Sequence, residues 1–423
     1  MSTTDLGGGA EKFAWDLFRV YRAAGHGSWL AVGEKRSTDA DILAIPNHAS
    51  RSSWARTWLG IARPFRGVRS KVPGARAARL ALEGFAEPRR AIERWRGYED
   101  FHFPGTWRLL KLPSQPPDIV HAHNLHGGYF DLWALPWLCR QLPVMVTLQD
   151  AWMISGHCSH SFDCERWKSG CGLCPDLTIY PAVRRDATAS NWHRKHDIFA
   201  RCRIYVASPS RWLAQKVQQS MLAQAIIDAR VIPNGVDLSV FRPAARQAAR
   251  AHLGLPAEAR IVLFTAGSLG GSPWRDAQTM RTALGYIVDG LGNRRNEGVR
   301  FVALGNEARM EQIGRASVQF APYERDPRLV AKFYQAADVY VHPAKVDTFP
   351  LSVLEALACG TPVVATAAGG IPEQIDDGRT GRLVRPADAE GLARAVIDLL
   401  TNDGLRARMG REATEAARRF FDL

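Results

Sequence analysis

Three features of the sequence predict an α/β fold of two Rossmann-like halves that face each other across a cleft. The chain has 423 residues, more than one hydrophobic core usually organises. Short apolar runs rich in Val and Ile alternate with longer helical patterns, which is typical of parallel sheets covered by helices. The pattern starts again past residue 243, after the segment FRPAARQ. In such sheets, ligands bind at the carboxyl ends of the strands.

We place the halves at residues 1–242 and 243–405, followed by the start of a C-terminal helix at 406–423. The predicted strands are 118–124, 143–150, 203–209 and 229–236 in the first half, and 260–267, 299–305, 339–343 and 362–367 in the second. The segment STTDLGGGAEKF predicts the end of a strand, a glycine turn and a helix start. No apolar run precedes Ser2, so we expect the natural chain to extend beyond both ends.

The composition is ordinary for a soluble enzyme, with 46% hydrophobic and 23% charged residues. No stretch approaches 18 uninterrupted apolar residues, which argues against a transmembrane helix. The N-terminus lacks the basic-then-apolar layout of a signal peptide. We therefore expect a cytoplasmic protein.

The net charge of +13 predicts an anionic partner. Segment 51–96 holds twelve Arg or Lys against three Glu, and Trp54, Trp58, Ile61 and Phe65 recur there at helical spacing. Examples of its basic residues are Arg63, Arg66, Arg69, Lys71, Arg89 and Arg90. A basic amphipathic helix binds an anionic membrane surface; the alternative is a solvated Arg-rich face packed on its own domain. No nucleic-acid motif accompanies the charge, so no nucleic-acid partner is expected.

The most informative segment is AADVYVHPAKVDTFPLSVLEALACGTPVVATAAGGIPEQIDDGRTGRLV. A strand ends at Pro343, a loop carries Asp347, and a helix starts near Pro350, where proline is favoured. Glu355 follows Asp347 by eight positions, so both carboxylates would lie near a helix N-terminus. Free N–H groups there suit a phosphate, and carboxylates accept hydrogen bonds from sugar hydroxyls. Spacing alone leaves the alternative that Asp347 caps the helix and Glu355 is a surface charge.

This segment resembles the E-x7-E region of the family 4 retaining glycosyltransferases of the GT-B fold, with Asp347 in place of the first Glu. The resemblance implies that Glu355 holds the ribose of a donor nucleotide and that Asp347 faces the donor sugar. It implies that the donor also meets the backbone of Thr348, Phe349, Pro350 and Leu351. The turn at Gly369, Gly370 and Glu373 matches the family and is expected to be structural.

Two further segments extend the resemblance. After the strand RIVLFTAG, Arg275 takes the place of the family's Lys for the donor diphosphate, whereas Ser268 stands where many members have Arg. IPNGVDLSVFRP resembles the family's NGVD-xx-F signature, and we expect Asn234 in it to be structural. The glycine turn at Gly8 and Gly9 would let the backbone approach the donor phosphate or the acceptor.

The first half resembles a narrower branch found in exopolysaccharide and colanic-acid clusters. The similarity rests on DIVHAHNLHGGYF, VTLQDAWMISGHCSHSFDCERWKSGCGLCP and ASPSRWLAQKVQQS, in that order. His121, His123 and His126 gather at a strand end, and we expect His126 to contact substrate. The branch usually has His-Asp where this chain has Gln149-Asp150. Gln does not titrate, so Asp150 is left to orient an acceptor hydroxyl.

Four cysteines, Cys158, Cys164, Cys171 and Cys174, lie within seventeen residues. The last two have the CxxC spacing that is common in zinc sites. We predict that these four hold a structural zinc ion. His157 or His160 could replace one of these ligands. Buried thiols without metal, or a redox pair, are the alternatives.

Together these features predict a retaining glycosyltransferase, of hexosyltransferase type, that moves a sugar from a nucleotide-sugar donor to a glycan or polyprenyl-linked acceptor. Its place would be the synthesis of exopolysaccharide or cell-surface polysaccharide, as a peripheral protein on the inner face of the membrane. Arg275 and helix-terminal amides would stabilise the leaving group, so catalysis would require no cofactor. The alternatives are a catalytically weak nucleotide-sugar-binding partner protein and a sugar-nucleotide epimerase.

Overall fold

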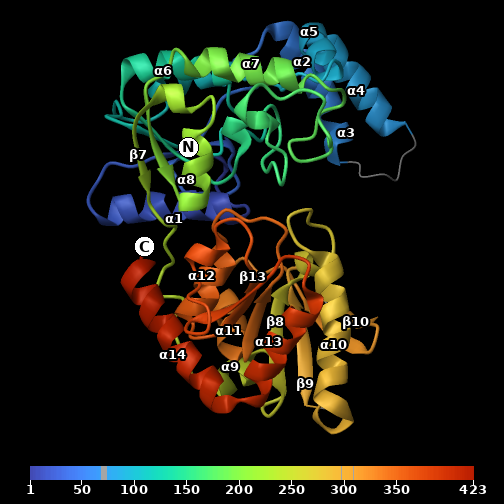
Figure 1. The fold of residues 1–423 in the computed structure, drawn as a ribbon. Coiled ribbons are helices and arrows are strands. Elements are labelled where there is room, and N and C mark those ends of the chain that lie inside the picture. Colours follow the sequence, from blue (N-terminus) through green and yellow to red (C-terminus); the bar gives the residue numbers. More distant parts are fainter. Residues whose placement is uncertain (68–73, 297, 308) are drawn as a thin grey trace. The chain divides into compact units, whose positions relative to one another are not determined.

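The computed structural model describes residues 1–67, 74–296, 298–307 and 309–423. The chain divides into two compact units, each described here by itself (Figure 1). The first consists of Met1–Ser208 and Leu213–Val231, and the second of Pro209–Trp212 and Ile232–Leu423. The predicted Arg69 and Lys71 of the basic segment lie outside the described residues.

The first unit ends at Val231, whereas the predicted first domain ran to residue 242. The difference arises because the segment after Val231 packs on the second unit. The Val236 N–H donates to the Phe421 carbonyl at 2.8 Å, and the buried Phe241 ring contacts Tyr334. The NGVD-xx-F signature therefore belongs to the core of the second unit.

The first unit is built on parallel strands in the orders β3-β2-β1 and β4-β5-β6-β7. Their bounds are β1 (Ser2–Thr4), β2 (Leu30–Glu34), β3 (Ile42–Ala44), β4 (Val120–His123), β5 (Val144–Thr147), β6 (Ile204–Ser208) and β7 (Ile226–Val231). Met1 joins the two groups, because its amine donates to the His121 carbonyl at 2.6 Å and its carbonyl accepts from the His123 N–H at 3.0 Å. The chain order reverses between β1 and β4, and sheets of this kind bind ligands at such a switch point.

The helices of the first unit fall into two sets. The helices α1 (Gly9–Ala23), α6 (Leu135–Gln141), α7 (Thr188–Phe199) and α8 (Arg211–Gln218) accompany the strands. Between β3 and β4 the chain inserts α2 (Ser53–Ala62), α3 (Pro64–Gly67), α4 (Ala75–Ala86) and α5 (Pro88–Trp95). We call these four helices the helical insertion; α4 packs against the other three (Figure 1).

The second unit has a sheet in the order β10-β11-β9-β8-β12-β13-β14, parallel except for β10. The strands are β8 (Arg260–Thr265), β9 (Val299–Leu304), β10 (Arg309–Ile313), β11 (Ala316–Ala321), β12 (Val339–His342), β13 (Val363–Thr366) and β14 (Gly381–Val384). The helices are α9 (Arg246–His252), α10 (Ala277–Asn296), α11 (Pro327–Ala336), α12 (Leu351–Ala358), α13 (Ala389–Thr401) and α14 (Asp403–Phe420). Short 3-10 turns in the two units are Pro104–Lys111, Leu132–Ala134, Trp152–Ile154, Arg166–Lys168, Ala223–Ala225, Ala266–Leu269 and Ile371–Glu373.

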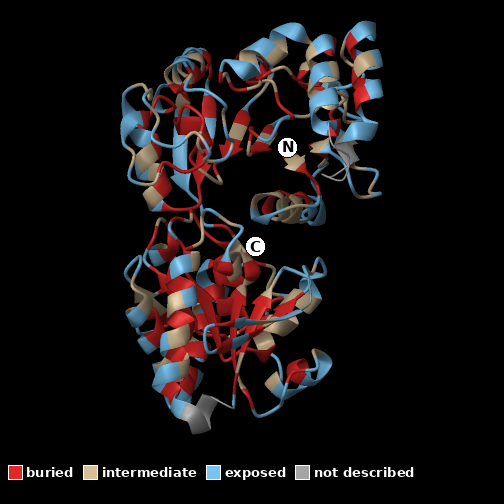
Figure 2. Cartoon of the chain, turned by 90° about the vertical axis from the view of Figure 1, so that its right-hand side faces the viewer, coloured by how far each residue is buried: buried red, intermediate tan, exposed pale blue. Residues whose placement is uncertain are grey.

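Alternation along the strands of the second unit builds two cores. Ile261 and Leu263 of β8 pack with α9, α11 and α12 on one face, while Val262 and Phe264 pack with α10 and α13 on the other. Successive strand side chains point to opposite faces, so a continuous apolar run fills both. Figure 2 shows these strands as buried, with exposed residues on the outer faces of the helices. Among the described residues, no helix is both long and apolar enough to cross a membrane.

Every predicted strand has a counterpart, but several strands were missed. The predicted strand 229–236 is β7, which runs only from Ile226 to Val231, since Pro233 lacks the N–H that would extend the ladder. The strands β2, β3, β10, β11 and β14 were not predicted. β10 has the sequence RMEQI and is largely exposed, so no apolar run marks it.

Candidate active site

The loop between β12 and α12 carries Asp347, Thr348, Phe349 and Pro350 of the predicted donor site. It is fixed at its start, where the Ala344 N–H donates to Thr366 Oγ1 at 2.8 Å and the Lys345 N–H donates to the Trp274 carbonyl at 2.9 Å. It ends at Pro350, which directly precedes the first residue of α12. Proline suits this place because it needs no hydrogen-bond acceptor and its φ is preset for a helix.

Arg275 and Asp347 form an ion pair across this loop. Arg275 Nη1 lies 2.7 Å from Asp347 Oδ2, and His342 Nε2 lies 3.5 Å from the same oxygen. Burial opposes ionisation of Asp347, but the charge of Arg275 and the contacts with Arg275 and His342 together outweigh it, so the pKa of the carboxyl lies well below its usual value. Burial and the same Arg275 charge lower the pKa of His342 to about 4. At neutral pH the group therefore consists of a carboxylate, a guanidinium and a neutral imidazole.

Two glycines hold the backbone of this loop from the other side. A Cβ on Gly369 would lie 2.0 Å from the Asp347 carbonyl oxygen, and one on Gly370 would lie 1.9 Å from that of Thr348. Gly369 also has φ +61°, and the Gly370 N–H donates to the Asp347 carbonyl at 2.9 Å. No larger residue fits at either position without moving the loop.

At the start of α12, several backbone N–H groups are free to donate hydrogen bonds. Within the described residues, the N–H groups of Thr348, Phe349 and Leu351 have no hydrogen-bond acceptor. The carbonyls of Phe349 and Pro350 are engaged by the side-chain amides of Asn234, at 3.4 Å, and of Gln374, at 3.1 Å. Free N–H groups at a helix start favour an anion.

Glu355 lies within α12 and is 7% exposed. Its Oε2 accepts a hydrogen bond from Tyr334 Oη at 3.0 Å, and burial together with the Glu355 charge raises the pKa of Tyr334 well above its usual value. Glu355 is thus a buried, partnered carboxylate. The alternative that it is a surface charge is wrong.

In the first unit, His126 and Asp150 form a second polar pair. His126 Nε2 lies 2.7 Å from Asp150 Oδ2, and Asp150 Oδ1 accepts from the Trp152 N–H at 2.9 Å. The Trp152 and Tyr180 rings flank the imidazole at 5.4 and 5.5 Å between centroids. Burial opposes ionisation of Asp150, but His126, the neighbouring His160 and the Trp152 N–H together outweigh it and lower the pKa of the carboxyl.

The other two histidines of the predicted cluster are structural. His121 Nε2 forms a hydrogen bond with Thr147 Oγ1 at 2.7 Å, and His121 Nδ1 forms one with Tyr21 Oη at 3.0 Å. Burial lowers the pKa of His121 to about 3, and His123 is 3% exposed beside it. Both are therefore neutral members of the sheet.

The glycine turn lies between β1 and α1. Gly8 is the residue before α1 and Gly9 is its first residue, and both are exposed. A side chain on Gly7 would meet Glu11 at 2.9 Å. The turn therefore presents bare backbone at the carboxyl end of β1, as the sequence predicts.

The four clustered cysteines lie in the segment between β5 and α7. His157 Nε2 lies 3.4 Å from Cys174 Sγ, and the Gly156 N–H donates to Cys171 Sγ at 3.3 Å. Burial raises the pKa of Cys158 to about 12 and that of Cys171 to about 11. Across the described ranges, no three His, Cys, Asp or Glu side chains are arranged to hold a metal ion. Zinc at Cys158, Cys164, Cys171 and Cys174 stays a prediction.

Known proteins resemble this chain in sequence and in fold. Residues 293–416 match the family model described as Glycosyl transferases group 1. A D-inositol 3-phosphate glycosyltransferase of Streptomyces avermitilis is 36% identical over 210 residues, 45% of this chain and 43% of that protein. One from Saccharomonospora viridis is 38% identical over 208 residues, 45% of this chain and 46% of that protein. The chain thus spans less than half the length of these relatives.

Solved structures match over the whole chain. Sucrose-phosphate synthase from Thermosynechococcus elongatus superposes with a TM-score of 0.59 at 18% identity, covering 100% of this chain and 94% of that one. WaaG, a glycosyltransferase involved in lipopolysaccharide biosynthesis, gives 0.58 at 16% identity, covering 99% and 95%. The fold is GT-B. The predicted pair of Rossmann-like domains is confirmed.

Within this GT-B fold, the structure brings together two pairs of predicted site residues, Arg275 with Asp347 in the second unit and His126 with Asp150 in the first. It also adds residues that the sequence did not single out. Lys195 and Glu99 form a buried ion pair, with Nζ 2.8 Å from Oε2, and Trp152 Nε1 donates to Glu99 Oε1. No sequence motif indicates this pair, because Lys195 and Glu99 are 96 positions apart. In the sequence, each resembles a charged surface residue of a helix or a loop.

Proposed function

We propose that the protein is a retaining glycosyltransferase that moves a sugar from a nucleotide-sugar donor to a glycan or lipid-linked acceptor in the synthesis of a cell-surface polysaccharide. The observation that carries the proposal is the Arg275–Asp347 ion pair, which joins two donor residues 72 positions apart at the start of α12. The glycosyl transferases group 1 match, residues 293–416, includes this loop and α12. The relatives' names support sugar transfer to a hydroxyl acceptor.

The donor is proposed to bind in the second unit. Its ribose would donate hydrogen bonds to the Glu355 carboxylate, and its diphosphate would meet Arg275 and the free N–H groups of Thr348 and Leu351. The acceptor oxygen bonds to the anomeric carbon, the bond from that carbon to the diphosphate oxygen breaks, and its electron pair leaves on the diphosphate. The hydroxyl proton passes to the departing diphosphate. The guanidinium and amides stabilise the charge that develops there.

The acceptor is proposed to bind in the first unit beside His126 and Asp150. His126 lines a cavity there, between the aromatic rings of Trp152 and Tyr180. Asp150 holds the imidazole by its 2.7 Å contact to Nε2. An oriented imidazole of this kind positions a hydroxyl for attack.

The test is turnover of nucleotide sugars, with UDP-glucose first, since a complex with it is known for Anabaena HepE, a structure of similar fold (TM-score 0.55, 16% identity, 100% of this chain and 95% of that one). We expect release of the nucleoside diphosphate, accelerated by an acceptor. Glu355→Gln should raise KM for the donor about 10- to 100-fold, because an amide accepts fewer hydrogen bonds from ribose. Tyr334→Phe is the matched control, since it removes the Glu355 partner and keeps the carboxylate.

The outcomes separate the rival functions. A nucleotide-sugar-binding partner protein would show a raised melting temperature with donor and no release of nucleotide. An epimerase would change the donor sugar in the absence of any acceptor. Turnover by Glu355→Gln at the wild-type KM would show that the donor site lies elsewhere.

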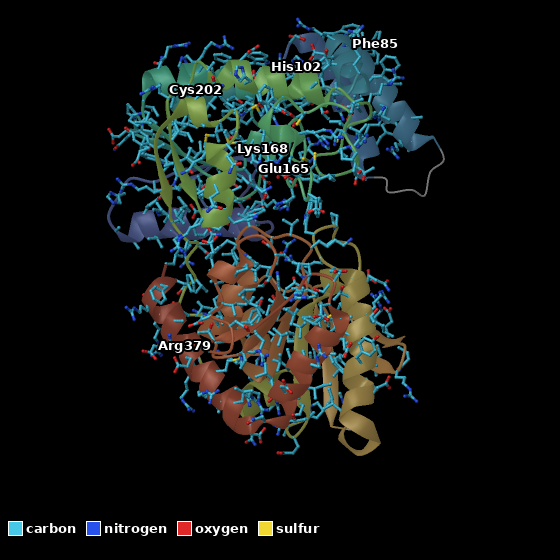
Figure 3. The ribbon with its side chains drawn as sticks, viewed as in Figure 1. Phe85, His102, Glu165, Lys168, Cys202 and Arg379 are labelled. Carbon is cyan, nitrogen blue, oxygen red and sulfur yellow. The ribbon has the colours of Figure 1, made fainter. Side chains whose placement is uncertain are left out.

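We also propose that the helical insertion contacts an anionic membrane surface. Trp54, Ile61 and Phe65 lie exposed along α2 and α3. Phe85 lies at the end of α4 (Figure 3). Its ring is 4.9 Å from that of Trp54 between centroids. The segment 51–96 carries nine more Arg and Lys than Glu, from twelve against three. Exposed aromatic side chains with surrounding cations suit an anionic interface.

Part of the basic charge is not available to a membrane. Arg51 and Arg90 pair with Glu87, and Arg90 also lies 2.7 Å from Asp100. Sedimentation with vesicles containing 30 mol% phosphatidylglycerol, against pure phosphatidylcholine vesicles, tests the proposal. Trp54→Ser with Phe65→Ser should abolish sedimentation with the anionic vesicles; unchanged sedimentation would refute the proposed contact.

A further inference from the structure

A cavity of about 820 Å³ lies entirely within the first unit. One wall comes from α4 and α5 of the helical insertion, and the other from the loop of His126 and the segment from Tyr180 to Arg184. The cavity therefore extends from the proposed acceptor group to the helical insertion. It is large enough for a ligand of more than one sugar ring.

The acidic side chains of this cavity are already paired. Glu83 lies 3.9 Å from Arg79, and Glu99 lies against the buried Lys195. Glu87 lies against Arg51 and Arg90, and Asp100 lies against Arg90. Because each of these carboxylates is already paired with a cation, none of them offsets the charge of the remaining arginines of the lining. The net charge of the cavity therefore depends on those arginines.

Two arginines of the lining are unpaired. Arg94, on α5, and Arg184, after Tyr180, form no ion pair with any residue that the structure describes, and both side chains are exposed to solvent. A third guanidinium, that of Arg185, stands 3.5 Å above the Trp95 ring, which also lines the cavity. The cavity thus has an excess of positive charge at the end formed by α5.

Aromatic side chains supply the apolar contact. Trp95 is 50% exposed and Tyr180 is 49% exposed, although both rings line the cavity. Flat rings with polar edges suit the C–H faces of a sugar. The ring of Tyr180 is also the one that flanks His126, so the aromatic wall leads to the His126–Asp150 pair.

We propose that this cavity binds an acceptor whose sugar is carried on a phosphate or diphosphate ester, with the phosphate at Arg94 and Arg184 and the sugar against Tyr180 toward His126. The guanidinium fork matches phosphate oxygens with two parallel hydrogen bonds. The inference rests on the proposed function, because it names the class of acceptor for that reaction.

The test is direct binding by calorimetry in the absence of donor. The probes are glucose 1-phosphate, farnesyl diphosphate and neutral glucose. The variant is Arg94→Gln with Arg184→Gln, and the matched control is Arg96→Gln, an exposed arginine outside the lining. Both changes are at exposed side chains, and melting temperatures check that the fold is kept.

We expect wild-type protein and Arg96→Gln to bind at least one of the anionic probes, and the double variant to bind it at least tenfold more weakly. Binding of glucose should be unchanged. Preference for farnesyl diphosphate indicates a lipid-linked acceptor, and preference for glucose 1-phosphate a soluble one. Equal affinity of the double variant for the anionic probes, or no binding of either probe to wild type, overturns the inference. Donor release without acceptor tests the proposed function separately, because it needs neither arginine.

Discussion

Arg275 Nη1 lies 2.7 Å from Asp347 Oδ2, although α10, β9, β10, β11, α11 and β12 separate the two residues in the chain. The pair puts a cation of the proposed donor site against the carboxylate that is proposed to face the donor sugar. This one contact therefore fixes the position of the Asp347 carboxylate and also determines how freely the Arg275 guanidinium can bind a diphosphate.

Arg275→Gln should lower kcat for sugar transfer about 100-fold, because the amide carries no charge for the developing diphosphate. Asp347→Asn should affect kcat less, since Arg275 remains. Steady-state kinetics with a saturating acceptor measures both. If Arg275→Gln lowered activity no more than Asp347→Asn does, the arginine would have only a structural role.

Asp150→Asn should lower kcat/KM for the acceptor and leave the KM for the donor unchanged. The amide no longer holds His126 by a charged contact, so the imidazole loses its fixed orientation. His126→Gln should give a similar loss, and the double variant little more, since the two residues act as one unit. Additive losses would mean that Asp150 and His126 act independently.

Lys195→Met should destabilise the first unit by about 3–5 kcal/mol, because it leaves Glu99 buried without a cation. Lys195 also donates to the carbonyls of Trp152, at 2.9 Å, and Ser155, at 3.1 Å, so the loop after Asp150 would loosen. Urea unfolding followed by tryptophan fluorescence measures the change. The exposed pair of Glu165 and Lys168 is the control (Figure 3): Lys168→Met should leave the midpoint nearly unchanged.

The stability of the second unit should fall as the pH falls from about 6.5 to 4. His342 has a folded pKa of about 4, below that of an unfolded histidine, so in this window the unfolded chain binds the extra proton. The free energy of unfolding should therefore decrease by about 1.4 kcal/mol for each pH unit lost. His342→Gln should reduce this slope by about one proton; an unchanged slope would mean that His342 titrates normally in the folded protein.

Protein purified without chelator should contain about one zinc ion per chain, because four cysteine thiolates can bind one zinc ion. Cys171→Ser with Cys174→Ser should remove the metal and lower the melting temperature. Cys139→Ser, outside the cluster, is the control. Elemental analysis that finds no zinc in the wild-type protein would overturn the zinc prediction and leave Cys158 and Cys171 as buried thiols whose pKa burial raises.

The sequence by itself determined the two-unit α/β fold, because that information is local. Apolar runs such as RIVLFT and PVVAT are typical of strands that are buried on both faces of a parallel sheet. A tight turn was likewise predicted from Gly369 and Gly370, and a helix start from Pro350. What lacked a local signal was missed: β10 is short and exposed, and the boundary at Val231 depends on where the next residues pack.

Only the tertiary structure decided how the site residues are partnered. Spacing left Glu355 open as a surface charge, and the fold buries it against Tyr334. Spacing grouped His121 with His126, and the sheet turns His121 toward Thr147 while His126 meets Asp150. The cause is the same in each case: a contact between residues far apart in the chain depends on how whole elements pack, which no stretch of neighbouring residues specifies.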